Sequence, residues 1–494
     1  MLSWRPTGLR PEVTTAETAG NPGTGRLVAV VGGGISGLAA AWELTGGAGA
    51  RSSTEVIVLE ASERLGGALQ SEPFAGRTVD MGPDGFLGRR PEAVELCKEV
   101  GLGDALAPIG ARGASVWARG RLRPLPENLA LGIPTRFWPT ARSGVIGLRG
   151  RLGLARDALW PRPDVRGPMG DRSIGPLVAR KLGQSVVDVL VDPLIGGIHA
   201  GSVDNMSAAA VYPPLLNAAQ RRGSLMRALR AEVPAPDPDA PPLFWSPVGG
   251  MAMLVHALDA ALRHRGVDIR LATSVHAIEP TASGRGWSVD TGGDAFDCDG
   301  LVLSTPAPIT SALLRPHDDE AAALLDAIDY ASVVLVTFQV AVDEVPPRAG
   351  TGFLVPRAAR RPKSREPWAV TACTFLDQKW PHLAREGDAL LRASLGRAGD
   401  EGAPQLSDAE VSERAWEELG LLIGVAGARK PKDAVVVRHP ASFPQYRVHH
   451  LLRTAAVEAA VARLGGLAVA GATYRGVGIP ACIASGRAAA RAVL

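Results

Sequence analysis

A buried strand followed by three spaced glycines constrains this chain more than any other stretch. Leu27 to Val31 are consecutive apolar residues, which is typical of a parallel strand covered on both faces. Gly32, Gly34 and Gly37 follow at the spacing Gly-x-Gly-x-x-Gly, and residues 38–44 are expected to continue as a helix. Glycines at this spacing allow a tight turn, close approach of the backbone to a pyrophosphate, and close packing of helix on strand. Phosphates would bind the free N–H groups where the helix begins.

A second strand supplies the next part of a dinucleotide site. Val56 to Leu59 is apolar and is followed by Glu60, twenty-three residues after Gly37. In this fold an acid at that place accepts hydrogen bonds from a ribose diol. The glycines alone would fit an ordinary turn, but together with the helix, the second strand and the acid they predict a dinucleotide-binding βαβ unit.

The residues after Glu60 favour FAD over a nicotinamide cofactor. Residues 64–67 have the pattern Arg-x-Gly-Gly, in which Arg64 is within reach of a phosphate and the glycines let the backbone pass close to a cofactor. A nicotinamide site does not need this pattern; the alternative is a glycine turn beside a surface arginine. Residues 77–81 predict a strand that leads into the turn 82–85, whose amides would lie beside the flavin.

The C-terminal residues predict the other half of the flavin site. Residues 467–470 are a short predicted strand, and residues 476–479 lead into a helix of small residues. Gly476 and Gly478 would let this helix begin close to the flavin, where its dipole would stabilise the anionic reduced ring. Taken alone, such a helix would only cap the sheet.

Composition limits the class of protein. The chain has 494 residues, 46% hydrophobic and 21% charged, which is typical of a globular protein of two or three domains. The net charge of +3 is too small for an electrostatic nucleic-acid binder. The cysteines lack Cys-x-x-Cys spacing, which predicts buried free thiols of a reducing cytoplasm and neither a disulfide frame nor a metal site: Cys97, Cys298, Cys373 and Cys482.

No targeting or membrane-spanning segment is expected. Residues 1–26 are rich in Thr, Pro, Gly and charge without an apolar segment, which predicts a disordered tail. The longest uncharged run, residues 27–42, is too short and glycine-rich to cross a bilayer.

We expect an α/β fold with a Rossmann-type FAD-binding domain, an inserted α+β substrate domain and a helical domain. Residues 287–289 and 301–303 are expected to complete a small β-meander. The predicted division is a discontinuous FAD-binding domain at 27–90, 243–305 and 432–494, a mostly helical insert at 91–230, a proline-rich loop at 231–242, and a substrate-binding domain at 306–431.

Arginines gather ahead of the helical insert and within it. Two interpretations stay open: a solvated basic face, or an electropositive mouth that receives carboxylates or an anionic lipid surface. The residues concerned are Arg89, Arg90, Arg119, Arg121 and Arg123.

Short motifs along residues 27–494 carry a family resemblance. They stand at residues 31–37, 60–61, 64–67, 82–85, 192–201, 371–374, 379–382, 396–401, 444–446 and 476–480. With these motifs the chain resembles the flavin-dependent porphyrinogen oxidases of the monoamine-oxidase and phytoene-desaturase superfamily. Within that group it is most similar to the bacterial coproporphyrinogen III oxidases of haem biosynthesis. The first motifs occur in a broad flavin superfamily, whereas the middle and last ones are specific to these oxidases.

The resemblance implies an activity, a cofactor and partners. FAD would carry a six-electron oxidation of a porphyrinogen to a porphyrin, with dioxygen reoxidising the flavin and giving hydrogen peroxide. The sequence shows no Ser-His-Asp set, metal cluster or prominent carboxylate pair, and no histidine is assigned as a base. A cytoplasmic location is expected, without nucleic acid. Peripheral association with the inner face of the membrane and a transient contact with the next haem-pathway enzyme stay open.

The resemblance also assigns site residues by position. Arg89 and Arg90 would contact the substrate, and Gly197 and His199 would line the pocket. His199 departs from the family's usual Tyr, and His439 from a common Trp. The residues expected to contact FAD are Gly32, Gly33, Gly34, Ile35, Ser36, Gly37, Glu60, Ala61, Ala68, Gly82, Pro83, Asp84, Gly85, Val275, Val477, Gly478 and Ile479.

Three alternatives remain from the sequence. A protoporphyrinogen IX oxidase would share the fold, and arginines at the mouth would discriminate because its substrate carries fewer carboxylates. An amine oxidase or carotenoid desaturase is more distant, since Tyr446 alone does not make an aromatic pair for an amine. A non-catalytic, FAD-stabilised scaffold or haem-trafficking partner would be yellow but inert.

Overall fold

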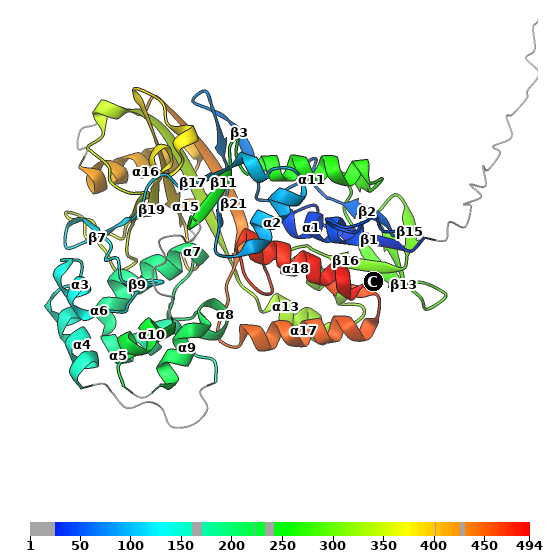
Figure 1. Ribbon diagram of the computed structural model, residues 1–494, viewed down its shortest axis with the longest axis horizontal. Helices are drawn as coiled ribbons and strands as arrows, with labels where there is room; N and C mark the ends of the chain where they lie inside the picture. The colour runs from blue at the N-terminus through cyan, green and yellow to red at the C-terminus, as the bar shows by residue number, and fades with distance from the viewer. Residues whose placement is uncertain (1–24, 161–169, 222, 233–241, 401, 425–429) are drawn as a thin grey trace, which may run out of the picture.

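The computed structural model describes residues 25–160, 170–221, 223–232, 242–400, 402–424 and 430–494. Most of the predicted tail and most of the predicted proline-rich loop lie outside these ranges. Figure 1 shows two sheet-containing parts side by side, with a group of short helices below one of them.

The first part is built on a sheet of five parallel strands in the order β12-β2-β1-β16-β22. From the central strand the chain moves to β2 on one side and later returns to β16 on the other. The carboxyl ends of β1 and β16 therefore form a topological switch point, where ligands bind in open α/β sheets. The strands are β1 Leu27–Val31, β2 Glu55–Leu59, β12 Asp268–Arg270, β16 Gly300–Leu303 and β22 Leu467–Val469.

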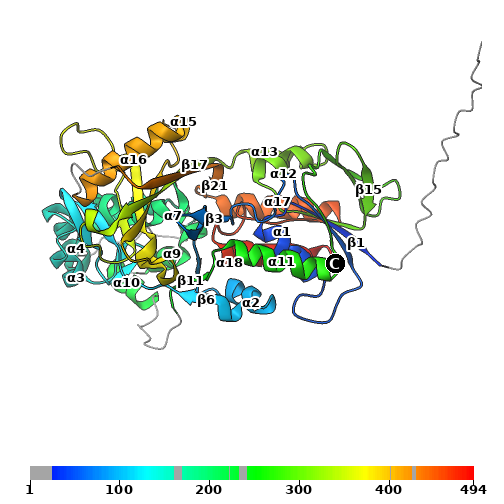
Figure 2. The ribbon, with the colours of Figure 1, turned by 90° about the horizontal axis from the view of Figure 1, so that it is seen from above.

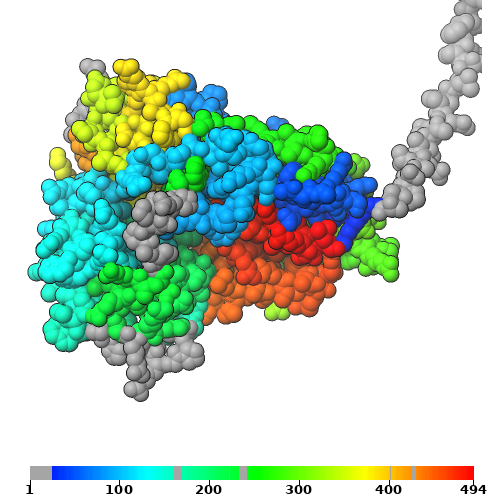
Figure 3. All heavy atoms as spheres, viewed as in Figure 1, coloured from blue at the N-terminus to red at the C-terminus, as the bar shows by residue number. Residues whose placement is uncertain are grey.

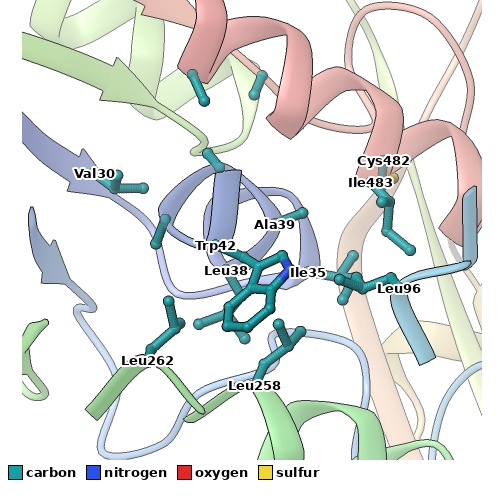
Figure 4. Close-up of a cluster of buried hydrophobic side chains, with 14 of the residues drawn as sticks. Val30, Ile35, Leu38, Ala39, Trp42, Leu96, Leu258, Leu262, Cys482 and Ile483 are labelled. Atoms are coloured by element: carbon teal, nitrogen blue, oxygen red, sulfur yellow. The ribbon is translucent and has the colours of Figure 1, made fainter. Parts of the chain in front are cut away.

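Helices cover one face of this sheet. Alternate side chains of its strands point to opposite faces, and those on this face are apolar and pack against the helices. Val28 and Val30 lie in a core with Trp42, Leu258 and Ile483, four of which are labelled in Figure 4 together with their neighbours from the same helices. The helices on this face are α1 Ile35–Leu44, α2 Pro91–Glu99, α11 Ala252–His264 and α18 Ile479–Ala492.

The other face of the parallel sheet carries a second core. Ala29, Val31 and Leu303 pack there with residues of a small antiparallel meander and three helices. The meander is β13 Ala277–Pro280, β14 Trp287–Asp290 and β15 Ala295–Cys298, and the helices are α12 Ala307–Leu314, α13 Asp319–Asp326 and α17 His450–Leu464.

The expectation that residues 301–303 belong to the meander is wrong. They form β16, which pairs with β1 and β22 in the parallel sheet. The reason is burial: Leu301, Val302 and Leu303 are all fully buried, so this strand needs cover on both faces, which the centre of the parallel sheet supplies.

The second part is a seven-stranded sheet in the order β21-β17-β20-β19-β18-β7-β8. Figure 2 shows α16, Asp408–Ile423, lying along one face of it, and Val336, Phe338 and Leu419 belong to the core between them. The opposite face turns toward the first part. The strands are β7 Ser115–Ala118, β8 Arg121–Pro124, β17 Tyr330–Ala341, β18 Gly352–Leu354, β19 Val370–Phe375, β20 Asp388–Leu395 and β21 Asp433–Pro444.

Short helices around one core form the third part, which lies beside both other parts in Figure 3. Between α6 and α7 residues 187–196 form a π-helix. The helices are α3 Phe137–Arg142, α4 Leu148–Leu159, α5 Ile174–Leu182, α6 Gln184–Val186, α7 Gly197–His199, α8 Ala208–Val211, α9 Pro213–Gln220 and α10 Leu225–Glu232.

The predicted division, which we keep as a proposal, needs two changes at the start of the helical insert. Helix α2 packs into the core of α1 and α18, because Ala93, Leu96 and Cys97 form an apolar stripe along it. Strands β7 and β8 extend the seven-stranded sheet and do not belong to the helices.

Small elements join the three parts. They are the hairpin β3 Ser71–Phe74 with β4 Arg77–Asp80, the three-stranded set β5 Phe86–Leu87, β11 Phe244–Pro247 and β6 Leu106–Pro108, the pair β9 Leu129–Ala130 with β10 Ile133–Pro134, and the helices α14 Leu376–Lys379 and α15 Gly402–Gln405. Among the helices that the structure describes, none has the length and apolar character needed to cross a bilayer.

Candidate active site

Two helices begin close together at the switch point of the parallel sheet. Helix α1 starts after Gly34 and α18 starts after Gly478, and within the described residues neither start is capped by a side chain. The two helices touch through their backbones, because a Cβ on Gly486 would lie 2.0 Å from the carbonyl oxygen of Ser36. Their free N–H groups and positive dipole ends therefore favour an anionic group at the same place.

The glycines of the first turn have separate roles. A Cβ on Gly37 would lie 1.9 Å from the carbonyl oxygen of Gly32, so this glycine is required for close packing of the helix on the turn. A Cβ on Gly34 would meet no described atom within 4 Å. Gly34 thus leaves open space beside the uncapped start of α1, and the residues present fit a dinucleotide pyrophosphate.

Glu60 lies at the edge of this space. Its Oε2 accepts a hydrogen bond from the Gly33 N–H at 2.7 Å, and its Oε1 accepts from the N–H and hydroxyl of Ser62. An ionised carboxylate offers about four lone-pair positions, so one remains for a ribose hydroxyl. The N–H of Thr273 donates to the Glu60 carbonyl at 2.9 Å, which brings the segment leading to Val275 beside the same strand end. Ala61 is exposed next to it.

The glycine-rich segment after Glu60 returns to the first turn. The N–H of Gly66 donates to the carbonyl of Gly33 at 2.8 Å. Arg64 donates to the carbonyl of Gly67 at 2.9 Å, within its own loop. A Cβ on Gly82 would lie 2.3 Å from the carbonyl oxygen of Ala68, so the 82–85 turn packs directly on this segment. These contacts bring together three of the segments predicted to contact FAD, residues 32–37, 64–68 and 82–85.

Side chains from the seven-stranded sheet hold the 82–85 turn from the opposite side. Arg392 on β20 donates to the carbonyls of Gly82, at 3.1 Å, and of Asp80. His439 on β21 has its Nε2 2.9 Å from the carbonyl oxygen of Met81. This histidine, one of the two departures from the family pattern, therefore contacts the predicted flavin loop through backbone.

Asp84 forms a nearly buried ion pair with Lys379, whose Nζ lies 2.8 Å from Oδ1. Burial alone would raise the pKa of the Asp84 carboxyl, but the charges of Lys379 and Arg392 outweigh burial and hold that pKa below its ordinary value. A Cβ on Gly85 would clash with Trp380, so the turn has no room for a larger residue there.

Lys379 and Arg392 were not predicted as site residues. Arg392 stands between the apolar residues Leu391 and Ala393 and is buried. A charged residue inside an apolar strand needs a partner, so the position of Arg392 within an apolar run is the feature of the sequence that could have identified it.

Gly197 and His199 lie on α7, at the open face of the seven-stranded sheet. A Cβ on Gly197 would be 3.7 Å from Leu354 of β18, and the adjacent Ile198 is 52% exposed. The face turned toward α7 is half-buried along several strands, at Leu335, Leu354, Ala372 and Ser394. Arg392, which holds the 82–85 turn, lies two residues before Ser394 on β20 and therefore on the same face.

The imidazole of His199 is neutral at ordinary pH. Burial lowers its pKa to about 4, and its Nδ1 is buried without a hydrogen-bond partner in the described residues. Its ring lies 5.8 Å from that of Tyr446, which in turn stacks on His450 at 4.0 Å. Gln445 donates to the His199 carbonyl at 2.9 Å and fixes the end of α7.

The two arginines predicted at the substrate mouth have different surroundings. Arg89 is exposed directly after β5. Arg90 bonds to Glu92 at 2.7 Å and lines a groove of about 620 Å³ between α17 and α18, together with Glu458 and Arg475. The two arginines thus differ in their surroundings, since the Arg90 guanidinium already has an acidic partner.

The four cysteines are buried and free, as predicted. Within the described ranges, no three His, Cys, Asp or Glu side chains are grouped so that they could hold a metal ion.

The parallel sheet, its two uncapped helix starts and the acid after β2 define an FAD-dependent oxidoreductase. Residues 35–494 match the family described as flavin containing amine oxidoreductase. The chain is 31% identical to the coproporphyrinogen III oxidase of Bacillus subtilis (94% of this chain, 96% of that one) and 34% identical to that of Mycobacterium tuberculosis (94% and 97%). It is also 30% identical to the protoporphyrinogen oxidase of Macaca fascicularis (95% and 98%).

Solved structures agree. A protein from Exiguobacterium assigned as a protoporphyrinogen oxidase superposes with a TM-score of 0.82 at 30% identity, covering 95% of this chain and 98% of that one. Cyclohexylamine oxidase from Brevibacterium oxydans, at 17% identity and a TM-score of 0.64 over 95% and 98%, shares the fold. The chain belongs to the flavin-containing amine oxidoreductases and, within them, to the coproporphyrinogen III oxidase family. Its cofactor is FAD, and the predicted fold class is confirmed.

Proposed function

We propose that this protein oxidises coproporphyrinogen III to coproporphyrin III in haem biosynthesis, with dioxygen as the acceptor. The observation that carries the proposal is the similarity, over nearly the full length of both chains, to proteins named coproporphyrinogen III oxidase. The substrate loses six electrons and six protons, and three molecules of dioxygen would take them up as three of hydrogen peroxide. FAD supplies the hydride acceptor.

The protein's own residues would position the two reactants. We propose that FAD is held by the contacts predicted from the sequence, which are Gly32 to Gly37, Glu60, Ala61, Ala68, Gly82 to Gly85, Val275 and Val477 to Ile479. Arg392 and His439 fix the 82–85 turn, which limits its movement against the seven-stranded sheet. Gly197 gives space on α7 for a flat, bulky substrate. Arg89 and Arg90 remain the proposed contacts for substrate carboxylates.

Aerobic incubation of the purified holoenzyme with coproporphyrinogen III tests this function. We expect porphyrin fluorescence to rise together with hydrogen peroxide, at three peroxides for each porphyrin. A control without enzyme corrects for spontaneous oxidation. A yellow protein that forms neither product from coproporphyrinogen would overturn the proposal and favour a non-catalytic FAD protein.

Oxidation of protoporphyrinogen IX is the second candidate. The similarity to the protoporphyrinogen oxidase of Macaca fascicularis favours it, since both chains are covered almost completely. The same assay with protoporphyrinogen IX separates the two. A higher kcat/KM for protoporphyrinogen would reverse the order of the candidates.

We also propose a cytoplasmic protein that binds peripherally to the inner face of the membrane, where a transient contact with the next haem-pathway enzyme would hand on the product. Helices α3 and α4 carry the support for the membrane contact. Five large apolar residues there are 61–74% exposed: Trp138, Leu148, Leu152, Leu159 and Trp160.

The charge on this surface favours anionic lipid. Arginines stand among the apolar residues, at 136, 142, 149, 151 and 156. The one acid between residues 136 and 160 is Asp157, which is buried and accepts hydrogen bonds from Ser224 and two backbone N–H groups. A basic surface with exposed Trp and Leu fits the interface of an anionic bilayer.

A further inference from the structure

Two arginines lie directly behind α7, at one end of the seven-stranded sheet. Arg357 follows β18 and Arg397 follows β20, and these strands point the same way because both are antiparallel to β19. Arg357 donates through Nη2 to the carbonyl of Gly201 at 3.1 Å. The N–H of Ala398 donates to the carbonyl of Ala200 at 2.7 Å. The Arg357 side chain and the backbone next to Arg397 therefore contact the end of the α7 segment.

Their hydrogen-bonding capacity is only partly used by the described residues, in which Arg357 donates through Nη1 to the Ala398 carbonyl at 3.4 Å and through Nη2 to the Gly201 carbonyl. The Nε atoms of Arg357 and Arg397 are buried and have no partner within the described residues. The Arg397 side chain makes no hydrogen bond or ion pair there at all, whereas a guanidinium has five donors to satisfy. Unpaired buried donors are unusual in native structures, and they indicate a missing acceptor.

The charge of this pair is also incompletely neutralised. The nearest acid to Arg357 is Asp192, whose Oδ2 lies 4.0 Å from its Nε. Burial lowers the pKa of Arg397 and the neighbouring charge of Arg357 lowers it further, whereas Asp400 and Asp192 raise it in part. Burial raises the pKa of the Asp192 carboxyl as well, so this acid compensates the arginines less than an ordinary carboxylate would. An additional anion between the two guanidinium groups would relieve their repulsion.

The position of the pair connects it with the substrate side of the molecule. A Cβ on Gly197 would lie 3.7 Å from Leu354, which stands three residues before Arg357. The Arg357 side chain is 33% exposed, so a ligand can reach it. Arg397 lies two residues after the end of β20, the strand that carries the half-buried Ser394.

We propose that Arg357 and Arg397 form a carboxylate-binding site that takes a propionate of the tetrapyrrole. Guanidinium groups bind carboxylates through two parallel hydrogen bonds, and a propionate of the substrate ends in such a carboxylate. The assignment of the carboxylate to a tetrapyrrole rests on the proposed function.

Equilibrium binding of the product to the holoenzyme tests the site without turnover. The probes are coproporphyrin III and its tetramethyl ester, which keeps the ring but lacks the charges, and the readout is quenching of porphyrin fluorescence. We expect Arg397→Gln to weaken binding of the acid about tenfold and to leave binding of the ester within twofold. Arg397→Lys should restore part of the affinity for the acid, because it returns the charge without the fork.

The matched control is Arg285→Gln. Arg285 is exposed in the turn between β13 and β14, which belongs to the meander and not to the seven-stranded sheet. This variant should bind the acid within twofold of the wild type. FAD absorbance and the melting temperature of each variant show whether the fold is retained; Arg397→Gln is expected to keep it, since that side chain makes no hydrogen bond to a described residue.

The outcomes separate the site from the proposed function. Equal weakening of acid and ester by Arg397→Gln, or no weakening of either, would overturn the carboxylate site even in an enzyme that oxidises coproporphyrinogen. A selective loss for the acid in a protein that oxidises no porphyrinogen would support the site and contradict the function.

Discussion

The carbonyl oxygen of Ser36 lies so close to Gly486 that there is no room for a side chain at Gly486. A Cβ on Gly486 would lie 2.0 Å from this oxygen and 3.1 Å from the Ala40 nitrogen. Because both neighbours are backbone, they cannot move aside as a flexible side chain does. The contact fixes how α18 lies on α1, and with it the distance between the two helix starts that face the FAD site.

Gly486→Ala should therefore affect cofactor binding from a distance. The methyl group forces the helices apart, which we expect to cost about 1–3 kcal/mol of folding free energy and to weaken FAD binding. Differential scanning fluorimetry and retention of flavin after dialysis measure the two effects. Gly293→Ala is the control, since a Cβ there would meet no described atom within 4 Å. An unchanged melting temperature and full flavin retention would show that the helices adjust without cost.

Glu60→Ala should weaken FAD binding more than it destabilises the protein. Hydrogen bonds to a charged group are worth about 2–3 kcal/mol, so the FAD dissociation constant should rise by about 30- to 150-fold. The apoprotein should retain its far-UV circular dichroism, because Glu60 follows a strand and does not fill the core. The exposed Glu63→Gln is the control. Equal flavin occupancy of variant and wild type after dialysis would remove Glu60 from the site.

The cofactor half of the fold was predictable from the sequence, whereas the arrangement around it was only partly so. Strand β1 and helices α1 and α18 carry local signals: apolar runs, glycines at fixed spacing and a helix start. The place of β16 depends on which strands it meets, because an apolar run of four residues fits either sheet. The packing of α2 against α18 joins residues nearly four hundred positions apart, which no local pattern reveals.

The candidate site shows the same limit. The backbone contacts to FAD follow from motifs, but the side chains that hold the 82–85 turn come from β20 and β21, far along the chain. Arg90 illustrates the converse: its neighbour in sequence, Glu92, becomes its partner in space. The unpaired donors of Arg397 become visible only when its surroundings are known.

Mild acid should destabilise the protein partly through His450. Burial, with Arg453 nearby, lowers the pKa of this imidazole from 6.5 to about 4. Between these two values the unfolded chain binds the proton and the native state does not. The contribution of His450 to the free energy of unfolding is therefore fully present above pH 6.5 and falls as the pH is lowered toward 4. At pH 5 the loss from this residue alone is about 2 kcal/mol.

Urea unfolding of wild type and His450→Phe at pH 7 and pH 5 measures this contribution. The variant lacks the titrating group, so its stability should fall less between the two pH values, whatever its stability at pH 7. His199, whose pKa is also lowered to about 4 by burial, keeps part of the acid sensitivity in the variant. An equal fall in both proteins would mean that His450 is not the group that titrates.

Binding to anionic vesicles should depend on the exposed tryptophans of the α3 and α4 surface. We expect Trp138→Ser with Trp160→Ser to abolish most sedimentation with vesicles of phosphatidylglycerol and phosphatidylcholine, while the folded state is kept because both side chains are largely exposed. Leu421→Ser, an exposed leucine on α16, is the control. Vesicles of phosphatidylcholine alone should bind the wild type weakly, since they lack the negative charge. Retained binding of the double variant would exclude this surface as the membrane contact.

Substrate choice should depend on Arg89 more than on Arg90. Coproporphyrinogen has four propionates and protoporphyrinogen two, so a free guanidinium at the mouth gains more from the first substrate. Arg89→Ala should raise KM for coproporphyrinogen about tenfold, leave KM for protoporphyrinogen nearly unchanged and change kcat little. Arg90→Ala is the matched comparison and should have a smaller effect, because its guanidinium is already paired with Glu92. Equal losses on both substrates would mean that Arg89 shapes the mouth without binding propionates, and no loss at all would return it to a solvated basic face.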